Sequence, residues 1–284
     1  MRSRLHLNTL RKGIEMDIAD FNALHMPALE RNEVRHNLLL GMMSQSTPDR
    51  AAETRRWTLG GAGACAMQTN ANRSIILGEL DERQCHALAD QVYGSAFAGA
   101  VGPENTAHWI VARAIELGLS FGDAEALMSH ELREPPIYPG ASGKARRANE
   151  DDLGLAFEWM AAFGAEAVPH DPPVTQEDVA KILKERVVLF WETGGETVSM
   201  AALARATRNA AAIGLVYTPP DLRARGYAGS VTAALAEHIF ASGKTTACLF
   251  TDLRNPYSNR CYAKIGFKPV CPTWHYYRSQ QHSS

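Results

Sequence analysis

The segment from 213 to 253 constrains the fold more than any other part of the sequence. It contains a buried strand at Ile213–Thr218, a short loop, an amphipathic helix at Ala228–Phe240, and a second apolar strand at Thr246–Leu253. The pair Pro219-Pro220 ends the first strand, because a proline cannot donate to a sheet ladder. A helix of this length makes a crossover connection, so we expect the two strands to lie parallel in an α/β sheet.

Periodicity predicts the other elements. Further helices are expected at residues 20–43, 81–93, 105–117, 150–163, 175–186 and 256–265. Strands are expected at 74–77 and from Phe267 onward. The β-prone runs Val187–Trp191 and Thr197–Leu203 flank Gly194-Gly195, which is typical of a hairpin.

A proline- and glycine-rich stretch at 134–144 separates two parts of the chain. Such composition is typical of loops and linkers. At roughly 100–200 residues per domain, the length also favours two domains. We therefore predict an N-terminal domain at 1–136 and a second domain at 137–284.

Composition excludes several classes of function. The chain has 284 residues, of which 45% are hydrophobic, and its formal net charge is −2. Such a chain lacks the positive field of a nucleic-acid-binding protein, so we expect no nucleic-acid partner. No run approaches the roughly 18 apolar residues that a membrane span requires. Residues 1–17 lack the continuous apolar stretch of a secretory signal.

The cysteines indicate a reducing compartment. The five cysteines form no CxxC pair and no zinc-ligand spacing with histidine. We expect reduced thiols, no bound metal and a cytoplasmic protein.

The loop after the first strand carries the most specific chemistry. Arg223, Arg225 and Gly226 stand directly before the helix. The first amides of a helix have no internal partner and carry partial positive charge, so a turn of amides here can cradle an anion. Glycine allows positive φ and close approach of an oxygen, and arginine suits phosphate geometry. Taken alone, these residues also fit a basic surface turn.

A second segment, Asn255–Phe267, follows the second strand. Asn255 and Pro256 are typical of a helix start, and Gly266 is typical of a helix end. Capping does not explain why Tyr262 stands seven residues after Asn255, which is close to two turns along one helix face. The alternative is that Tyr262 is only a packed aromatic residue.

The stretches LVYTPPDLRARGYAG and NPYSNRCYAKIGF together resemble the GNAT superfamily of N-acetyltransferases. The wording is most similar to a subgroup with two domains, in which the first half looks like a degenerate copy of the same fold. The resemblance implies an α/β fold of the α+β GNAT type, with a mixed, splayed central sheet flanked by helices. The N-terminal half contains no second R-x-x-G-x-G/A loop, and we interpret the glycine-rich Leu59–Ala64 as a turn or packing site.

The resemblance also implies a set of functional residues. In this superfamily the R-x-x-G-x-G/A loop binds the CoA diphosphate, and the preceding bulged strand pairs with pantetheine. The implied acyl donor is acetyl-CoA, and Tyr262 is the implied general acid on the leaving thiolate. The implied donor-binding residues are Val216, Tyr217, Thr218, Arg223, Ala224, Arg225, Gly226, Tyr227, Ala228, Gly229, Asn255 and Ser258.

We expect direct attack of a neutral primary amine on the thioester. A backbone amide near Val216 or Tyr217 would stabilise the oxyanion. The acceptor, a small-molecule or peptide amine, would meet loops around 150–175 and 192–196 and residues of the first domain. A covalent route through Cys261 is an alternative. No general base is assigned, and the candidates besides water are Glu158, Glu192, Glu196, Asp252 and His275.

Three functions are compared with the sequence. The first is an N-acyltransferase, and the second is a module that binds acyl-CoA without turnover. The third is a nucleotide-binding protein unrelated to CoA, which would need a Walker lysine or a ribose-binding acid that the sequence lacks. The sequence leaves open the acyl chain length and whether the protein is a monomer or a homodimer.

Overall fold

The computed structural model describes residues 16–45 and 53–279. The chain forms two compact units, Met1–Ser129 with Cys271–Ser284, and His130–Val270. The chain passes from the first unit to the second within β5, Glu125–Leu132, and returns within β11, Lys268–Tyr277. The predicted domains, 1–136 and 137–284, stay predictions. Of the segment predicted to lack a secretory signal, residues 1–15 lie outside the described residues.

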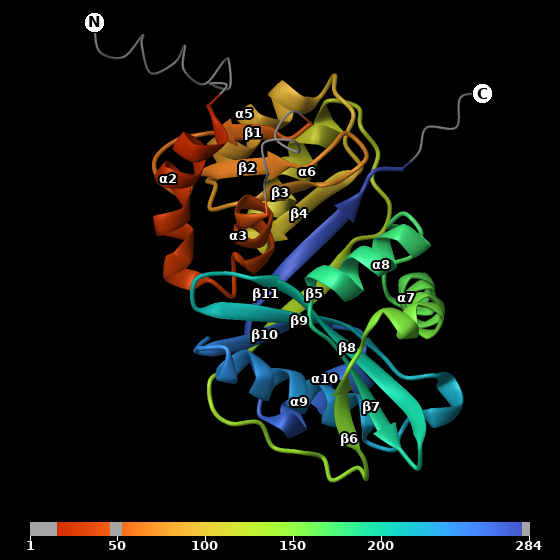
Figure 1. Ribbon diagram of the computed structural model, residues 1–284. Helices are drawn as coiled ribbons and strands as arrows, with labels where there is room; N and C mark the ends of the chain where they lie inside the picture. The colour runs from red at the N-terminus through yellow and green to blue at the C-terminus, as the bar shows by residue number, and fades with distance from the viewer. Residues whose placement is uncertain (1–15, 46–52, 280–284) are drawn as a thin grey trace, which may run out of the picture. The chain divides into compact units, whose positions relative to one another are not determined.

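The first unit is a mixed sheet with helices on both faces (Figure 1). Its strands, in spatial order before β11, are β1 (Arg55–Thr58), β2 (Cys65–Gln68), β3 (Ile75–Leu77) and β4 (Gly99–Pro103). Its helices are α2 (Ile18–Leu29), α3 (Asn37–Ser44), α5 (Glu82–Val92) and α6 (Glu104–Glu116). Strand alternation decides the packing: Ile75 and Leu77 face α5 and α6, while Ile76 faces α2 and α3.

The second unit is built on the same plan. Its strands, in spatial order, are β10 (Thr246–Asp252), β9 (Ala210–Tyr217), β8 (Glu196–Ala206), β7 (Val188–Thr193) and β6 (Lys144–Arg147). Its helices are α7 (Leu153–Ala167), α8 (Gln176–Glu185), α9 (Tyr227–Ala241) and α10 (Pro256–Ile265). Phe190 and Met200 pack against α7 and α8, whereas Ile213 and Leu249 pack against α9 and α10.

The two units share one pattern of strand pairing. In the first, β1, β2 and β3 are antiparallel neighbours, and β3 runs parallel to β4 across the helix α5. In the second, β7, β8 and β9 are antiparallel neighbours, and β9 runs parallel to β10 across α9. The structure thus contains the unit of strand, loop, helix and parallel strand twice.

The structure confirms the elements predicted after residue 174 and the helices α5, α6 and α7. The region 20–43 is two helices rather than one, because Pro27 lies in α2 and a 3₁₀ turn, Glu30–Asn32, follows it. The glycine-rich Leu59–Ala64 is the turn between β1 and β2, closed by the bond from the Leu59 amide to the Ala64 carbonyl. None of the five cysteines, all within the described residues, is in a disulfide.

Candidate functional site

Strand β9 carries a bulge before it reaches the loop. Between the pairs Met200–Tyr217 and Ala202–Gly214, two residues of β9 oppose one residue of β8. Leu215 has a φ of 51°, which is uncommon for a residue other than glycine. The bulge turns consecutive side chains of β9 to new directions directly before the strand ends.

Strands β9 and β10 part beyond their first residues. Their pairs run from Ala210 with Thr246 to Ala212 with Cys248. From Ile213 to Tyr217, β9 has no β10 partner among the residues that the structure describes. The β10-facing edge of this part of β9 is therefore available to an extended ligand, as the family resemblance implied.

The end of β9 is fixed by side chains. The Ser199 hydroxyl donates to the Tyr217 carbonyl at 3.0 Å and lies 2.8 Å from the Thr218 hydroxyl. Arg223 Nε donates to the Thr218 carbonyl at 2.9 Å, and its Nη2 contacts Glu166 of α7 at 2.7 Å. The loop is thus tied back to β9 and α7 before the first residues of α9.

The two arginines of the loop, predicted to bind a phosphate, both contact acceptors within the protein. Arg223 pairs with Glu166, and Arg225 Nη2 donates to the Asp221 carbonyl at 3.0 Å. Their charges lie in the loop, as predicted, but the structure gives each one an acceptor within the protein. Their direct contact with a phosphate stays a prediction.

The start of α9 is a turn of unpaired backbone amides. Gly226 is the N-cap residue with φ of 84°, and no side chain caps the helix. Ala224 also has positive φ, at 63°. Among the described residues, no acceptor lies against the amides of Ala224, Arg225 or Gly226, and the first helical amides have no partner by geometry. Such a turn concentrates partial positive charge at one point.

A buried hydroxyl accompanies these amides. Ser230, one turn after Gly226, is 0% exposed, and its Oγ has no hydrogen-bond partner in the described part of the chain. An unpaired buried hydroxyl is unfavourable unless something satisfies it. Its place in the first turns of α9 adds a polar group beside the amides.

The proline-rich segment predicted as a linker packs onto α9. A Cβ atom on Gly229 would lie 2.6 Å from Pro139 Cγ, and one on Gly226 would lie 3.4 Å from the Ala141 Cβ. The Tyr138 hydroxyl donates to Glu237 of α9 at 2.7 Å. Glycine at these two positions lets the segment close over the helix start, and a side chain at Gly229 would displace it.

The equivalent loop of the first unit is closed. The Asp81 carboxylate accepts from the Gln84 amide at 2.8 Å, and the Asp81 amide donates to Gln84 Oε1 at 2.9 Å, which completes a capping box on α5. The amides of Gly78 and Glu79 donate to Cys65 and Gly63. Because the Asp81 carboxylate caps the helix and the loop amides already donate to acceptors within the protein, this loop is unsuitable for an anion.

Helix α10 places Tyr262 and Asn255 as the sequence predicted. Asn255 Oδ1 accepts from the amides of Tyr257 and Ser258, so its capping role is confirmed. Tyr262 is 9% exposed and packs edge-on against Phe267, with ring centroids 6.1 Å apart. Burial raises the pKa of the Tyr262 phenol well above its usual range, so the hydroxyl stays protonated near neutral pH.

No candidate base is singled out by its surroundings. Glu192 accepts from Arg146, Asp252 accepts from Arg254, and His275 contacts the Ser74 hydroxyl in the first unit. Burial raises the pKa of the Cys261 thiol, which disfavours the thiolate that a covalent route needs.

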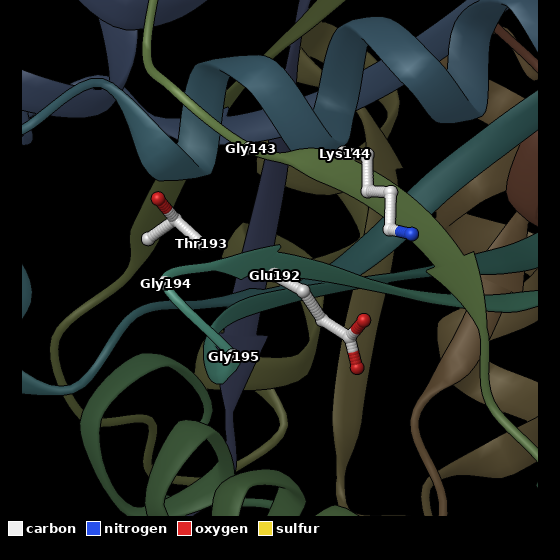
Figure 2. A pocket seen from close by; sticks show the side chains of 6 residues that line it. All are labelled: Gly143, Lys144, Glu192, Thr193, Gly194 and Gly195. Carbon is white, nitrogen blue, oxygen red and sulfur yellow. The ribbon is translucent and has the colours of Figure 1, made fainter.

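The turn of the β7–β8 hairpin lines a hollow of about 460 Å³. Figure 2 shows Lys144 and Glu192 extending to the same side of their neighbouring strands. The remaining lining residues are Gly143, Thr193, Gly194 and Gly195. This turn belongs to the 192–196 loop that the sequence predicted to meet the acceptor, and that contact stays a prediction.

Sequence reasoning missed Ser199, Glu166 and Ser230. Ser199 and Glu166 act on a loop that lies 19 and 57 residues away in the chain, so no local pattern identifies them. Ser230 falls within the helix that follows the R-x-x-G-x-A loop, and its polar side chain on the buried face was the available signal.

Among the described residues, no helix could cross a membrane, and no cluster of His, Cys, Asp or Glu could hold a metal ion.

Comparison with known proteins identifies the fold. Residues 192–279 match the family model described as FR47-like protein. No curated protein matches the sequence.

Several solved structures are similar over most of the chain. A protein from Drosophila aligns with a TM-score of 0.67 at 12% identity, covering 92% of this chain and 97% of that one. A GCN5-related N-acetyltransferase from Kribbella flavida aligns with a TM-score of 0.58 at 15% identity, covering 88% and 97%. A GNAT-family acetyltransferase from Colwellia psychrerythraea gives 0.55 at 12% identity, covering 98% of both. The chain therefore has the GNAT fold, and the resemblance seen in the motifs is confirmed at that level.

The conformation of Gly226 predicts opposite outcomes for one substitution at two positions. Gly226→Ala places a Cβ on a left-handed residue and should cost about 1 kcal/mol, which lowers the thermal midpoint by about 3 °C. Gly154→Ala in α7, where the added Cβ would meet no other part of the structure within 4 Å, should raise the midpoint because alanine favours a helix. Equal shifts in calorimetry would contradict the assigned backbone.

Proposed function

We propose that this chain, which has the GNAT fold and whose residues 192–279 match the FR47-like family, transfers the acyl group of an acyl-CoA to a primary amine. Acetyl-CoA is the proposed donor. The observation that carries the proposal is the uncapped start of α9, where Gly226 leaves a turn of backbone amides beside the splayed end of β9. A diphosphate matches such a turn in charge and in its number of acceptor oxygens.

The chain supplies a binding site along the length of the donor. The diphosphate lies on the amides of Ala224–Ala228, and pantetheine extends along the open edge of β9 at Val216–Thr218. The acyl end then lies near Tyr262, which belongs to the same hydrophobic cluster as Val216. Arg223, Arg225, Gly229, Asn255 and Ser258 are the remaining proposed contacts.

The reaction proceeds by direct transfer. The amine forms a bond to the thioester carbonyl carbon, and a backbone amide near Val216 or Tyr217 stabilises the oxyanion. As the bond from carbon to sulfur breaks, the Tyr262 hydroxyl gives its proton to the thiolate. The raised pKa of this phenol keeps the proton in place until sulfur develops charge. The proton of the amine leaves to water, and water returns a proton to the Tyr262 phenolate.

The Tyr262 hydroxyl predicts a selective loss of turnover. Tyr262→Phe keeps the ring that packs on Phe267. The thermal midpoint should therefore be unchanged, and the Kd for acetyl-CoA should stay within twofold of the wild-type value. The rate constant kcat should fall about 100-fold or more, because general acid assistance is typically worth about 10²–10⁴. The measurement is release of CoA thiol with a panel of primary amines, alongside calorimetry with acetyl-CoA. An unchanged kcat would show that Tyr262 is only a packed aromatic residue and not the general acid.

The contrast between Gly226 and Asp81 predicts how to close the site. Gly226→Asp places a carboxylate at the start of α9, at a φ of 84° that aspartate tolerates. A negative charge beside these amides should weaken CoA binding roughly 100-fold, because it repels the phosphate.

The control for this variant is Gly243→Asp. Gly243 has nearly the same φ, 87°, at the opposite end of α9, and a Cβ atom placed there would have no neighbour within 4 Å. Calorimetry with CoA should show wild-type affinity for this control. Equal affinity of both variants for CoA would place the diphosphate elsewhere.

A further inference from the structure

Helix α10 exposes an aromatic ring with an arginine stacked on it. Tyr257 is 77% exposed, the highest value among the large hydrophobic residues described as exposed. The guanidinium carbon of Arg260 lies 5.3 Å from the centre of its ring. Among the residues that the structure describes, no ion pair joins Arg260 to a carboxylate. Neither the core of the second unit nor an ion pair therefore accounts for the exposed Tyr257 ring and the Arg260 cation.

Tyr257 and Arg260 lie near the N-terminal end of α9. Strands β9 and β10 are parallel, so α9 and α10, which follow them, begin at the same edge of the sheet. A Cβ atom on Gly229, in the first turn of α9, would lie 3.3 Å from Cys261 Sγ. Tyr257 is four residues before Cys261 on the same stripe of α10, about 6 Å nearer its start. Gly226 stands three residues before Gly229, so the same spacing places Tyr257 near the level of Gly226.

The chemistry of the pair fits the part of CoA that lies beyond the diphosphate. That part is an adenosine with a phosphate on its 3′ oxygen. A tyrosine ring offers a stacking face to any base, and a guanidinium binds a phosphate monoester through two parallel hydrogen bonds. We infer that Tyr257 and Arg260 form the subsite for the 3′-phosphoadenosine of the donor, with Tyr257 under the adenine and Arg260 on the 3′-phosphate. This inference rests on the proposed function.

The test compares CoA with 3′-dephospho-CoA in calorimetry on the full chain. The wild-type protein should bind CoA about tenfold more tightly than dephospho-CoA, as expected for one charge-assisted pair at a partly exposed site. Arg260→Ala should remove this preference while leaving the affinity for dephospho-CoA within twofold. Tyr257→Ala should weaken both ligands, and Tyr257→Phe should restore both, because the ring rather than the hydroxyl stacks.

The matched control is Lys264→Ala. It removes the same charge from an exposed residue of the same helix, one turn further from its start. This variant should keep the wild-type preference for CoA. If Arg260→Ala also keeps that preference, the subsite is overturned while the diphosphate site stands. If the wild-type chain binds neither ligand, the proposed function fails, and the subsite fails with it.

Discussion

The structure of the candidate site depends on one backbone constraint, the left-handed conformation of Gly226 at the start of α9. A helix presents its first amides without partners, and proteins usually satisfy them with a capping side chain. Here the N-cap residue has no side chain, so the amides face the space beyond the helix. The bulge in β9, the hydrogen bonds of Ser199 and Arg223, and the packing of Pro139 on Gly229 all hold the loop in the conformation that this requires.

The first unit provides an internal comparison for this constraint. It repeats the order of strand pairing and the helices on both faces, yet its corresponding helix starts at Asp81 with a complete capping box. Its strands also stay close, since a Cβ atom on Gly102 would lie 2.7 Å from Leu77 Cβ. We propose that the first unit is a degenerate copy of the second in which the anion site has been closed.

The sequence predicted the second unit better than the first, for physical reasons. From residue 175 onward each element has a clear period, a cap or a turn residue, and the helix at 256–265 could be bounded to the residue by Asn255 and Gly266. Strands β1, β2, β4, β5 and β6 were not predicted. They are short, rich in glycine and alanine, or charged. Their conformation depends on pairing with neighbouring strands rather than on local propensity. The site was predicted where it is contiguous in sequence. Contacts such as Tyr138 with Glu237, 99 residues apart, depend on the fold and have no local signal.

The most direct test of the account is the response of individual backbone amides to CoA, followed by nuclear magnetic resonance on the isotopically labelled chain. The amide signals of Gly226, Tyr227 and Ala228 should shift on addition of CoA. The signals of Asp81 and Gln84, at the capped start of α5, should stay in place. Shifts at Asp81 and Gln84 with none at Gly226 would contradict the claim that uncapped amides of α9 bind the diphosphate.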